Sequence, residues 1–94
     1  MLSRIPIDLA TIGRENIDKE ILRVGIIAEL DAINLYEQMA ELATTDEMKA
    51  ILLDIAKEEK THVGEFQTML LRYDEEQVKE LEAGKKEVEE DILG

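Results

Sequence analysis

The chain has 94 residues, of which 45% are hydrophobic, 3% aromatic and 36% charged, and its formal net charge is −12. This length allows one domain with a marginal core, so packing against partners is expected, and the composition is typical of a helical protein rather than a β-sandwich. The negative charge argues against nucleic acid or a polyanionic membrane as partner, and the lack of cysteine excludes disulfides and thiolate metal sites.

Residues 1–16 contain Pro6 and Gly13 and show no sustained apolar period, which predicts a loosely held N-terminal arm whose role is open. The arm lacks the apolar core of a secretory signal. Every apolar run in the chain is too short and too interrupted by charge to cross a membrane, so a cytoplasmic location is expected. A long helix is predicted over residues 17–43, with Asn16 as its N-cap.

A polar break at Thr44, Thr45 and Asp46 precedes a second predicted helix, over residues 46–73. Because the connecting loop is so short, the two helices should form an antiparallel hairpin. A third helix is predicted over residues 75–93; it is interrupted by Gly84 and mostly charged, so it needs a partner to be stable. The expected fold is a single all-α domain over residues 1–94.

Apolar residues recur at alternating spacings of three and four along both hairpin helices, which defines a buried seam on each. The first seam is Leu22, Ile26, Glu29, Ile33, Tyr36, Ala40 and Ala43. The second is Met48, Leu52, Ile55, Glu59, His62, Phe66, Met69 and Tyr73. Glu29, Glu59 and His62 interrupt these seams, and neither seam holds a basic residue that would compensate a buried carboxylate.

The hairpin should bring the interrupting residues together. Glu29 precedes the turn by about fifteen residues and Glu59 follows it by about fifteen, so both lie about 22 Å from the turn at about 1.5 Å per residue. His62 lies one helical turn further along the same face. Carboxylate oxygen and imidazole nitrogen together suit iron, manganese, zinc or copper better than magnesium or calcium. We therefore predict a metal site.

Two glutamates and one histidine seldom saturate a first-row metal, and the chain holds no second such set. Di-iron carboxylate bundles use a Glu from each of two helices and a Glu-x-x-His motif from each of two others, and this hairpin has one of each. A two-fold dimer of hairpins would therefore rebuild a ferritin-like four-helix bundle, with two metal ions between the chains.

The run AELDAINLYEQMAELATTDEMKAILLDIAKEEKTHVGEF resembles the encapsulated ferritins, and especially the ferritin-like domain fused to some archaeal encapsulin shell proteins. The resemblance covers residues 21–73. It implies a ferroxidase that oxidises Fe(II) to Fe(III) at a di-iron centre, with two iron ions per dimer interface, although other divalent metals are expected to substitute. It also implies a decameric ring, a pentamer of dimers, inside a cytoplasmic encapsulin nanocompartment that stores the iron mineral.

The same resemblance gives roles to individual residues. The ferroxidase ligand positions fall on Glu29, Glu59 and His62. Tyr36 matches a tyrosine beside the metals, and Asp31 matches an acidic residue that guides metal ions to the site. Ala28 and Leu35 depart from the family by replacing a second acidic residue of that path and a tryptophan, which leaves the iron path open. The sequence ends at EEDILG without a recognisable shell-targeting tail, as expected for an excised domain or a truncated chain.

Two other functions remain open. An acidic helical oligomerisation or cargo module would use its buried glutamates and histidine only to set the register of the helices. A rubrerythrin-like peroxidase would use similar di-iron chemistry, but such chains normally carry both Glu-x-x-His halves. Tyr36 also suits plain packing, and Asp31 lies off the seam, where a solvent-facing position is the ordinary one. Glu58 and Lys60 are expected to face solvent.

Overall fold

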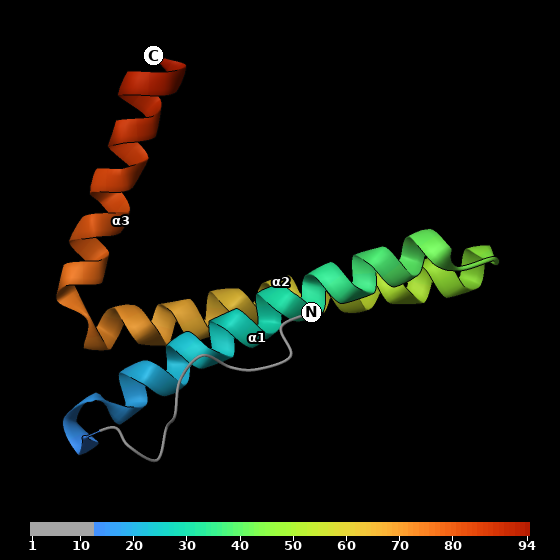
Figure 1. The fold of residues 1–94 in the computed structure, drawn as a ribbon, viewed down its shortest axis with the longest axis horizontal. Coiled ribbons are helices and arrows are strands. Elements are labelled where there is room, and N and C mark those ends of the chain that lie inside the picture. The colour runs from blue at the N-terminus through green and yellow to red at the C-terminus, as the bar shows by residue number, and fades with distance from the viewer. Residues whose placement is uncertain (1–12) are drawn as a thin grey trace.

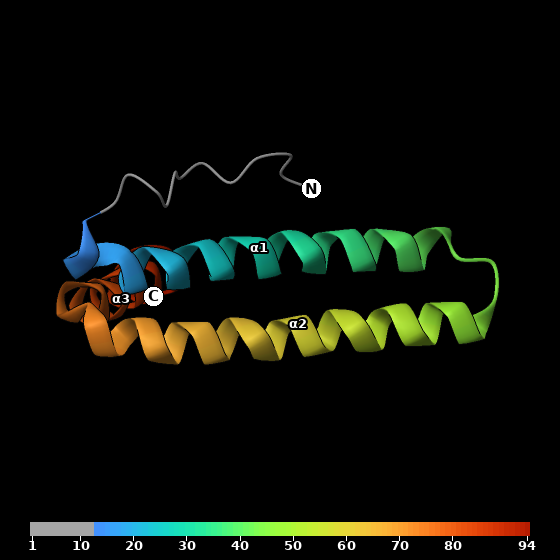
Figure 2. The ribbon, with the colours of Figure 1, turned by 90° about the horizontal axis from the view of Figure 1, so that it is seen from below.

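The computed structural model describes residues 13–94, and this part of the chain is helical, with no β-strand (Figure 1). The elements are α1 (Arg14–Leu42), α2 (Asp46–Tyr73), α3 (Glu75–Glu87) and the π-helical segment η2 (Val88–Leu93). α1 and α2 run antiparallel, side by side (Figure 2), and α3 leaves the end of α2 at a steep angle (Figure 1). The predicted all-α fold and hairpin are confirmed, while most of the predicted N-terminal arm lies outside the described residues.

The first helix begins earlier than predicted. α1 starts at Arg14, directly after Gly13, whose extended backbone (φ −65°, ψ 149°) forms the N-cap without a side-chain hydrogen bond. Asn16, the predicted N-cap, instead lies in the first turn, where its backbone N–H donates to the Gly13 carbonyl at 3.1 Å. Glycine is an accepted N-cap residue, so the helix can start here without a side-chain acceptor.

The turn between α1 and α2 is short because α2 carries a strong start signal. Thr45 has an extended backbone, and its hydroxyl oxygen accepts a hydrogen bond from the Met48 N–H at 3.2 Å. Asp46 and Glu47 follow in the first turn, where negative charge is favourable beside the positive end of the helix dipole. The helix therefore begins at Asp46, as predicted, and residues 43–45 reverse the chain.

The hairpin buries a narrow apolar strip that departs from the predicted seam on α2. The buried apolar residues of the described chain are Ile33, Ala40, Leu52, Ala56 and Leu70. Ala56 and Leu70 were not in the predicted seam, whereas its members Met48, Met69 and Tyr73 are 52%, 44% and 50% exposed. A straight helix drifts by about 20° per heptad from a strict alternation of three and four, so residues at the ends of a long seam leave the contact face.

Large apolar side chains remain exposed on every α-helix and on η2. They are Ile21, Leu30, Met39, Leu42, Met48, Ile51, Leu53, Met69, Tyr73, Val78, Leu81, Val88, Ile92 and Leu93. No large side chain in the described part of the chain is fully buried, and none of its helices is long and apolar enough to cross a membrane. So much exposed apolar surface is unusual for a solitary chain and supports the expectation that the helices pack against a partner.

Asp74 links α1, α2 and α3 at their junction. Its Oδ1 accepts a hydrogen bond from the Gln77 N–H at 3.0 Å, which caps α3, and its Oδ2 accepts one from Arg23 of α1 at 2.7 Å. The Gln77 N–H, the Arg23 guanidinium and the positive charge of Lys19 hold the pKa of the Asp74 carboxyl below its usual value, although burial acts in the opposite direction. One carboxylate thus fixes where α3 leaves the hairpin.

We expect Asp74→Asn to lower the melting temperature at neutral pH, because asparagine keeps the capping acceptor but loses the charge that Arg23 and Lys19 stabilise. A carboxyl whose pKa is lower in the folded chain stabilises it above the unfolded pKa of about 4, and this stabilisation disappears as the pH falls through the folded pKa. Thermal unfolding followed by circular dichroism should therefore show the difference between wild type and variant shrinking in acid. A difference that does not depend on pH would contradict this, and Glu75→Gln, in the same helical turn, is the control.

Candidate metal centre

The hairpin brings together the three residues that interrupt its predicted seams. The Nδ1 atom of His62 lies 3.4 Å from Oε1 of Glu29 on α1 and 3.4 Å from Oε2 of Glu59, its neighbour on α2. One ligand atom from each residue lies within 4.8 Å of the other two. The expected common level of the two glutamates is therefore present, and the ligand role of the three residues stays a prediction.

The cluster is half-enclosed by the two helices. The side chains of Glu29 and Glu59 are 18% and 19% exposed, whereas that of His62 is 43% exposed. The Oε2 atom of Glu29 is buried and has no hydrogen-bond partner among the described residues. A buried carboxylate oxygen without a donor is costly, and a bound cation would compensate it.

The spacing of the cluster fits ligands of one ion better than a hydrogen-bonded triad. The distance of 3.4 Å from Nδ1 of His62 to each carboxylate is longer than the usual N–H···O range. Two adjacent ligands at about 2.1 Å from a metal stand about 3.0–3.4 Å apart. Two carboxylate oxygens and one imidazole nitrogen suit iron, manganese or zinc. The residues present therefore fit a transition-metal ion.

Tyr36 and Asp31 lie outside this cluster. Tyr36 is half-buried on α1 and is not one of the three clustered residues. Asp31 is half-buried and lines a shallow groove on α1 with Ile27, Leu30 and Asn34. Their proposed roles beside the metals and on the path of the metal ions stay predictions.

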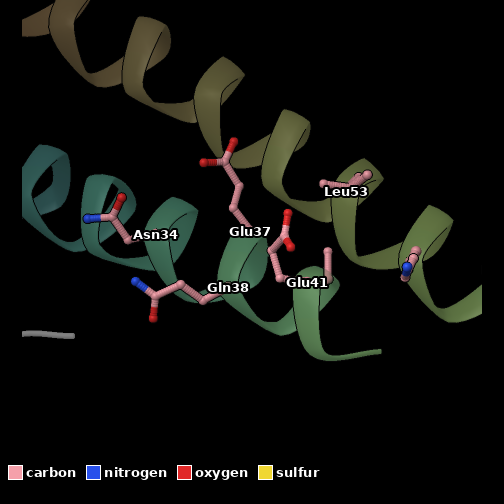
Figure 3. Close-up of a pocket in the computed structure, with 7 residues that line it drawn as sticks. Asn34, Glu37, Gln38, Glu41 and Leu53 are labelled. Atoms are coloured by element: carbon pink, nitrogen blue, oxygen red, sulfur yellow. The ribbon is translucent and has the colours of Figure 1, made fainter. Parts of the chain in front are cut away.

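A larger groove lies nearer the hairpin turn and contains none of the three cluster residues. Figure 3 shows side chains of α1 and Leu53 of α2 around it. The lining residues are Asn34, Glu37, Gln38, Ala40, Glu41, Lys49 and Leu53. All except Ala40 are exposed, and Glu37 accepts a hydrogen bond from Lys60 at 3.0 Å. Lys60 thus faces solvent, as expected, and this groove is part of the polar surface.

Comparison with known proteins identifies the family. A family model described as Rubrerythrin matches residues 20–92. The crystal structure of the encapsulated ferritin domain from Pyrococcus furiosus matches with a TM-score of 0.83 at 49% identity, over 97% of this chain and 98% of that one. The chain belongs to the encapsulated ferritins of the rubrerythrin family. The predicted family resemblance is therefore confirmed, and the match includes α3 as well as the hairpin.

Two curated relatives of this encapsulated ferritin are longer proteins. The ferritin-like-encapsulin shell fusion protein of Pyrococcus furiosus is 62% identical over 71 residues, which are 76% of this chain and 21% of the relative. The encapsulin nanocompartment cargo protein EncC of Myxococcus xanthus is 38% identical over 69 residues, which are 70% of this chain and 53% of the relative. The chain thus spans about a fifth and about half of the lengths of these relatives.

We expect Glu29→Gln to raise the melting temperature of the metal-free encapsulated ferritin and to remove its stabilisation by metal. The substitution removes a charge whose Oε2 atom is buried without a partner, but it also removes an anionic ligand. Wild type should gain about 2.7 kcal/mol at a Mn(II) concentration of about 100 times Kd. Thermal unfolding with and without Mn(II) measures both effects.

Glu58→Gln is the matched control for this test, because Glu58 is an exposed neighbour of Glu59 on α2. It should leave the stabilisation by Mn(II) unchanged. Full stabilisation of Glu29→Gln by Mn(II) would show that Glu29 is not a ligand.

Proposed function

We propose that this encapsulated ferritin is a ferroxidase that oxidises Fe(II) to Fe(III) at a di-iron centre shared by two copies of the chain. The observation that carries the proposal is the convergence of Glu29, Glu59 and His62, with one buried carboxylate oxygen left without a partner. Family membership supports iron as the metal, since ferritin-like carboxylate bundles bind it with this set of ligands.

The centre needs a second copy because one hairpin supplies only three protein ligands. A two-fold axis would bring a second Glu29, Glu59 and His62 against the first and rebuild the four-helix bundle with two iron ions. The 43% exposure of His62 and the exposed apolar residues of the hairpin are consistent with such an interface. The dimer is the minimal active unit in this proposal, and five dimers form the ring.

The glutamates and the histidine have different parts in the proposed reaction. Two Fe(II) ions together would give two electrons, which with two protons reduce dioxygen to hydrogen peroxide, or hydrogen peroxide to two molecules of water. Glu29 and Glu59 offset the positive charge, and oxygen ligands favour the Fe(III) product over Fe(II). His62 adds a neutral, directional nitrogen ligand. Tyr36 donates a hydrogen bond to a ligand carboxylate in the assembled centre, and Asp31 attracts the incoming cations.

The two relatives described above support a location for this chemistry. One relative is a fusion of a ferritin-like part to an encapsulin shell, and the other is a cargo protein of an encapsulin nanocompartment. We propose that this chain also works inside a cytoplasmic encapsulin shell, where the Fe(III) product is stored as mineral.

The family model also favours a second candidate, a peroxidase of rubrerythrin type. The same ligands would hold the iron, but peroxide would be the substrate to be removed. The two candidates differ in the oxidant, so Fe(II) oxidation under air without peroxide supports the ferroxidase. Oxidation that requires added peroxide supports the peroxidase.

We expect Glu29→Ala and His62→Ala to lower the rate of Fe(II) oxidation at least about 100-fold, because each removes a ligand of the reacting metal. The experiment adds Fe(II) anaerobically, admits air and follows the ferric absorbance. Glu58→Ala, on the solvent side of α2, should keep the wild-type rate. Equal rates in wild type and all variants would contradict a ferroxidase and would leave the non-catalytic oligomerisation or cargo module.

A further inference from the structure

The aromatic ring of Phe66 sits directly against Gly25. A Cβ atom at Gly25 would lie 3.1 Å from Cε1 and from Cζ of Phe66 and 3.2 Å from Cδ1. These are atoms of one rigid ring, so the whole ring or its helix would have to shift by a few tenths of an ångström to accommodate a methyl group. The ring thus occupies space beside position 25 that is open because glycine has no side chain.

This contact stands one helical turn from the metal centre on both helices. Gly25 precedes Glu29 by four residues on α1, and Phe66 follows His62 by four on α2. Residues four apart lie on the same helical face. The ring therefore lies on the side of the centre that points away from the hairpin turn. Ile33 and Ala56, which are 8% and 2% exposed, fill the hairpin on the other side.

Comparison with the other helical glycines shows that Gly25 is a special position. Glycine inside a helix is less favourable than alanine, so its place there is worth explaining. A Cβ atom at Gly64 or Gly84 would meet nothing within 4 Å. Among the glycines inside the described helices, only Gly25 faces a neighbour that a Cβ atom would displace.

The separation of the helices affects the three ligands unequally. Glu59 and His62 lie on one helix, so their distance of 3.4 Å does not depend on where α1 stands. Glu29 lies on the other helix, so its distance of 3.4 Å from His62 changes directly when the helices move apart. A shift of a few tenths of an ångström at Gly25 would therefore be felt mainly by Glu29.

We propose that Gly25 and Phe66 are positioning residues of the metal centre, forming a spacer that sets the distance from Glu29 to the two ligands on α2. This inference rests on the proposed metal centre. The spacer acts through the backbone separation of α1 and α2 and touches no metal. Enlarging position 25 should loosen the Glu29 ligand, and shrinking the ring should make room for the added methyl group.

The test is a Co(II) titration of the full chain, followed by visible absorption at a temperature where circular dichroism shows every variant folded. Gly25→Ala should weaken Co(II) binding about tenfold or more and change the absorption spectrum of the bound ion. The double variant Gly25→Ala with Phe66→Leu should bring the affinity for Co(II) and the absorption spectrum back toward wild type, because the smaller side chain accommodates the methyl group. Gly84→Ala, the same change in open space on α3, should alter neither.

The outcomes separate the spacer from the metal centre itself. If Gly25→Ala has the Co(II) affinity and the absorption spectrum of the wild type, the spacer is contradicted and the metal centre is not. If Gly25→Ala does not fold, the single variant Phe66→Leu is the test instead. A Phe66→Leu variant that binds Co(II) with wild-type affinity would also contradict the spacer. Failure of the wild type to bind Co(II), or equal binding by Glu29→Ala, would overturn the metal centre and the spacer with it. If the variants at positions 25 and 66 lose stability but keep the wild-type spectrum of bound Co(II), Phe66 is an ordinary packing residue and the proposal is contradicted.

Discussion

Two carboxylates and one imidazole lie between α1 and α2, and they limit how the rest of the hairpin can pack. Like charges that lie this close in a half-buried site repel each other, and Oε2 of Glu29 has no donor among the described residues. A hairpin with leucines at these positions would gain a continuous apolar core. The chain instead has three polar side chains in the middle of the hairpin, and a bound cation is the simplest compensation for the negative charge of the two carboxylates.

The small core follows from the same constraint. The buried strip consists of a few apolar residues on either side of these three polar side chains, and large apolar side chains on the outer faces stay exposed. Asp74 holds the base of α3 through Arg23 and Gln77, but the rest of α3 leaves the hairpin (Figure 1). Under the proposed function, a single chain would be incomplete in two respects, since it would supply half of the ligands of a di-iron centre, and many large apolar side chains of its described residues are exposed.

The sequence predicted the convergence of Glu29, Glu59 and His62 better than it predicted the packing around them. A short loop and a fixed rise per residue were enough to place Glu29 opposite Glu59 before any contact was known. The buried Ala56 and Leu70 were missed because a fixed alternation drifts away from the contact face of a long helix.

The sequence carries a local signal for the cap at Asp74 but none for the contact between Gly25 and Phe66. Asp74 followed three residues later by Gln77 is a helix-start pattern that could have indicated the cap. Its pairing with Arg23, fifty-one positions away, depends on the fold. The contact of Gly25 with Phe66 could not be predicted, because a glycine within a helical pattern does not say which neighbour occupies its space.

Native mass spectrometry during an anaerobic Fe(II) titration tests the central claim most directly, because it reports metal and chain stoichiometry in the same particle. A centre built from two half-sets of Glu29, Glu59 and His62 should place iron on dimers or larger assemblies, with about two ions per pair of chains. Tight, stoichiometric iron on single chains would contradict the account.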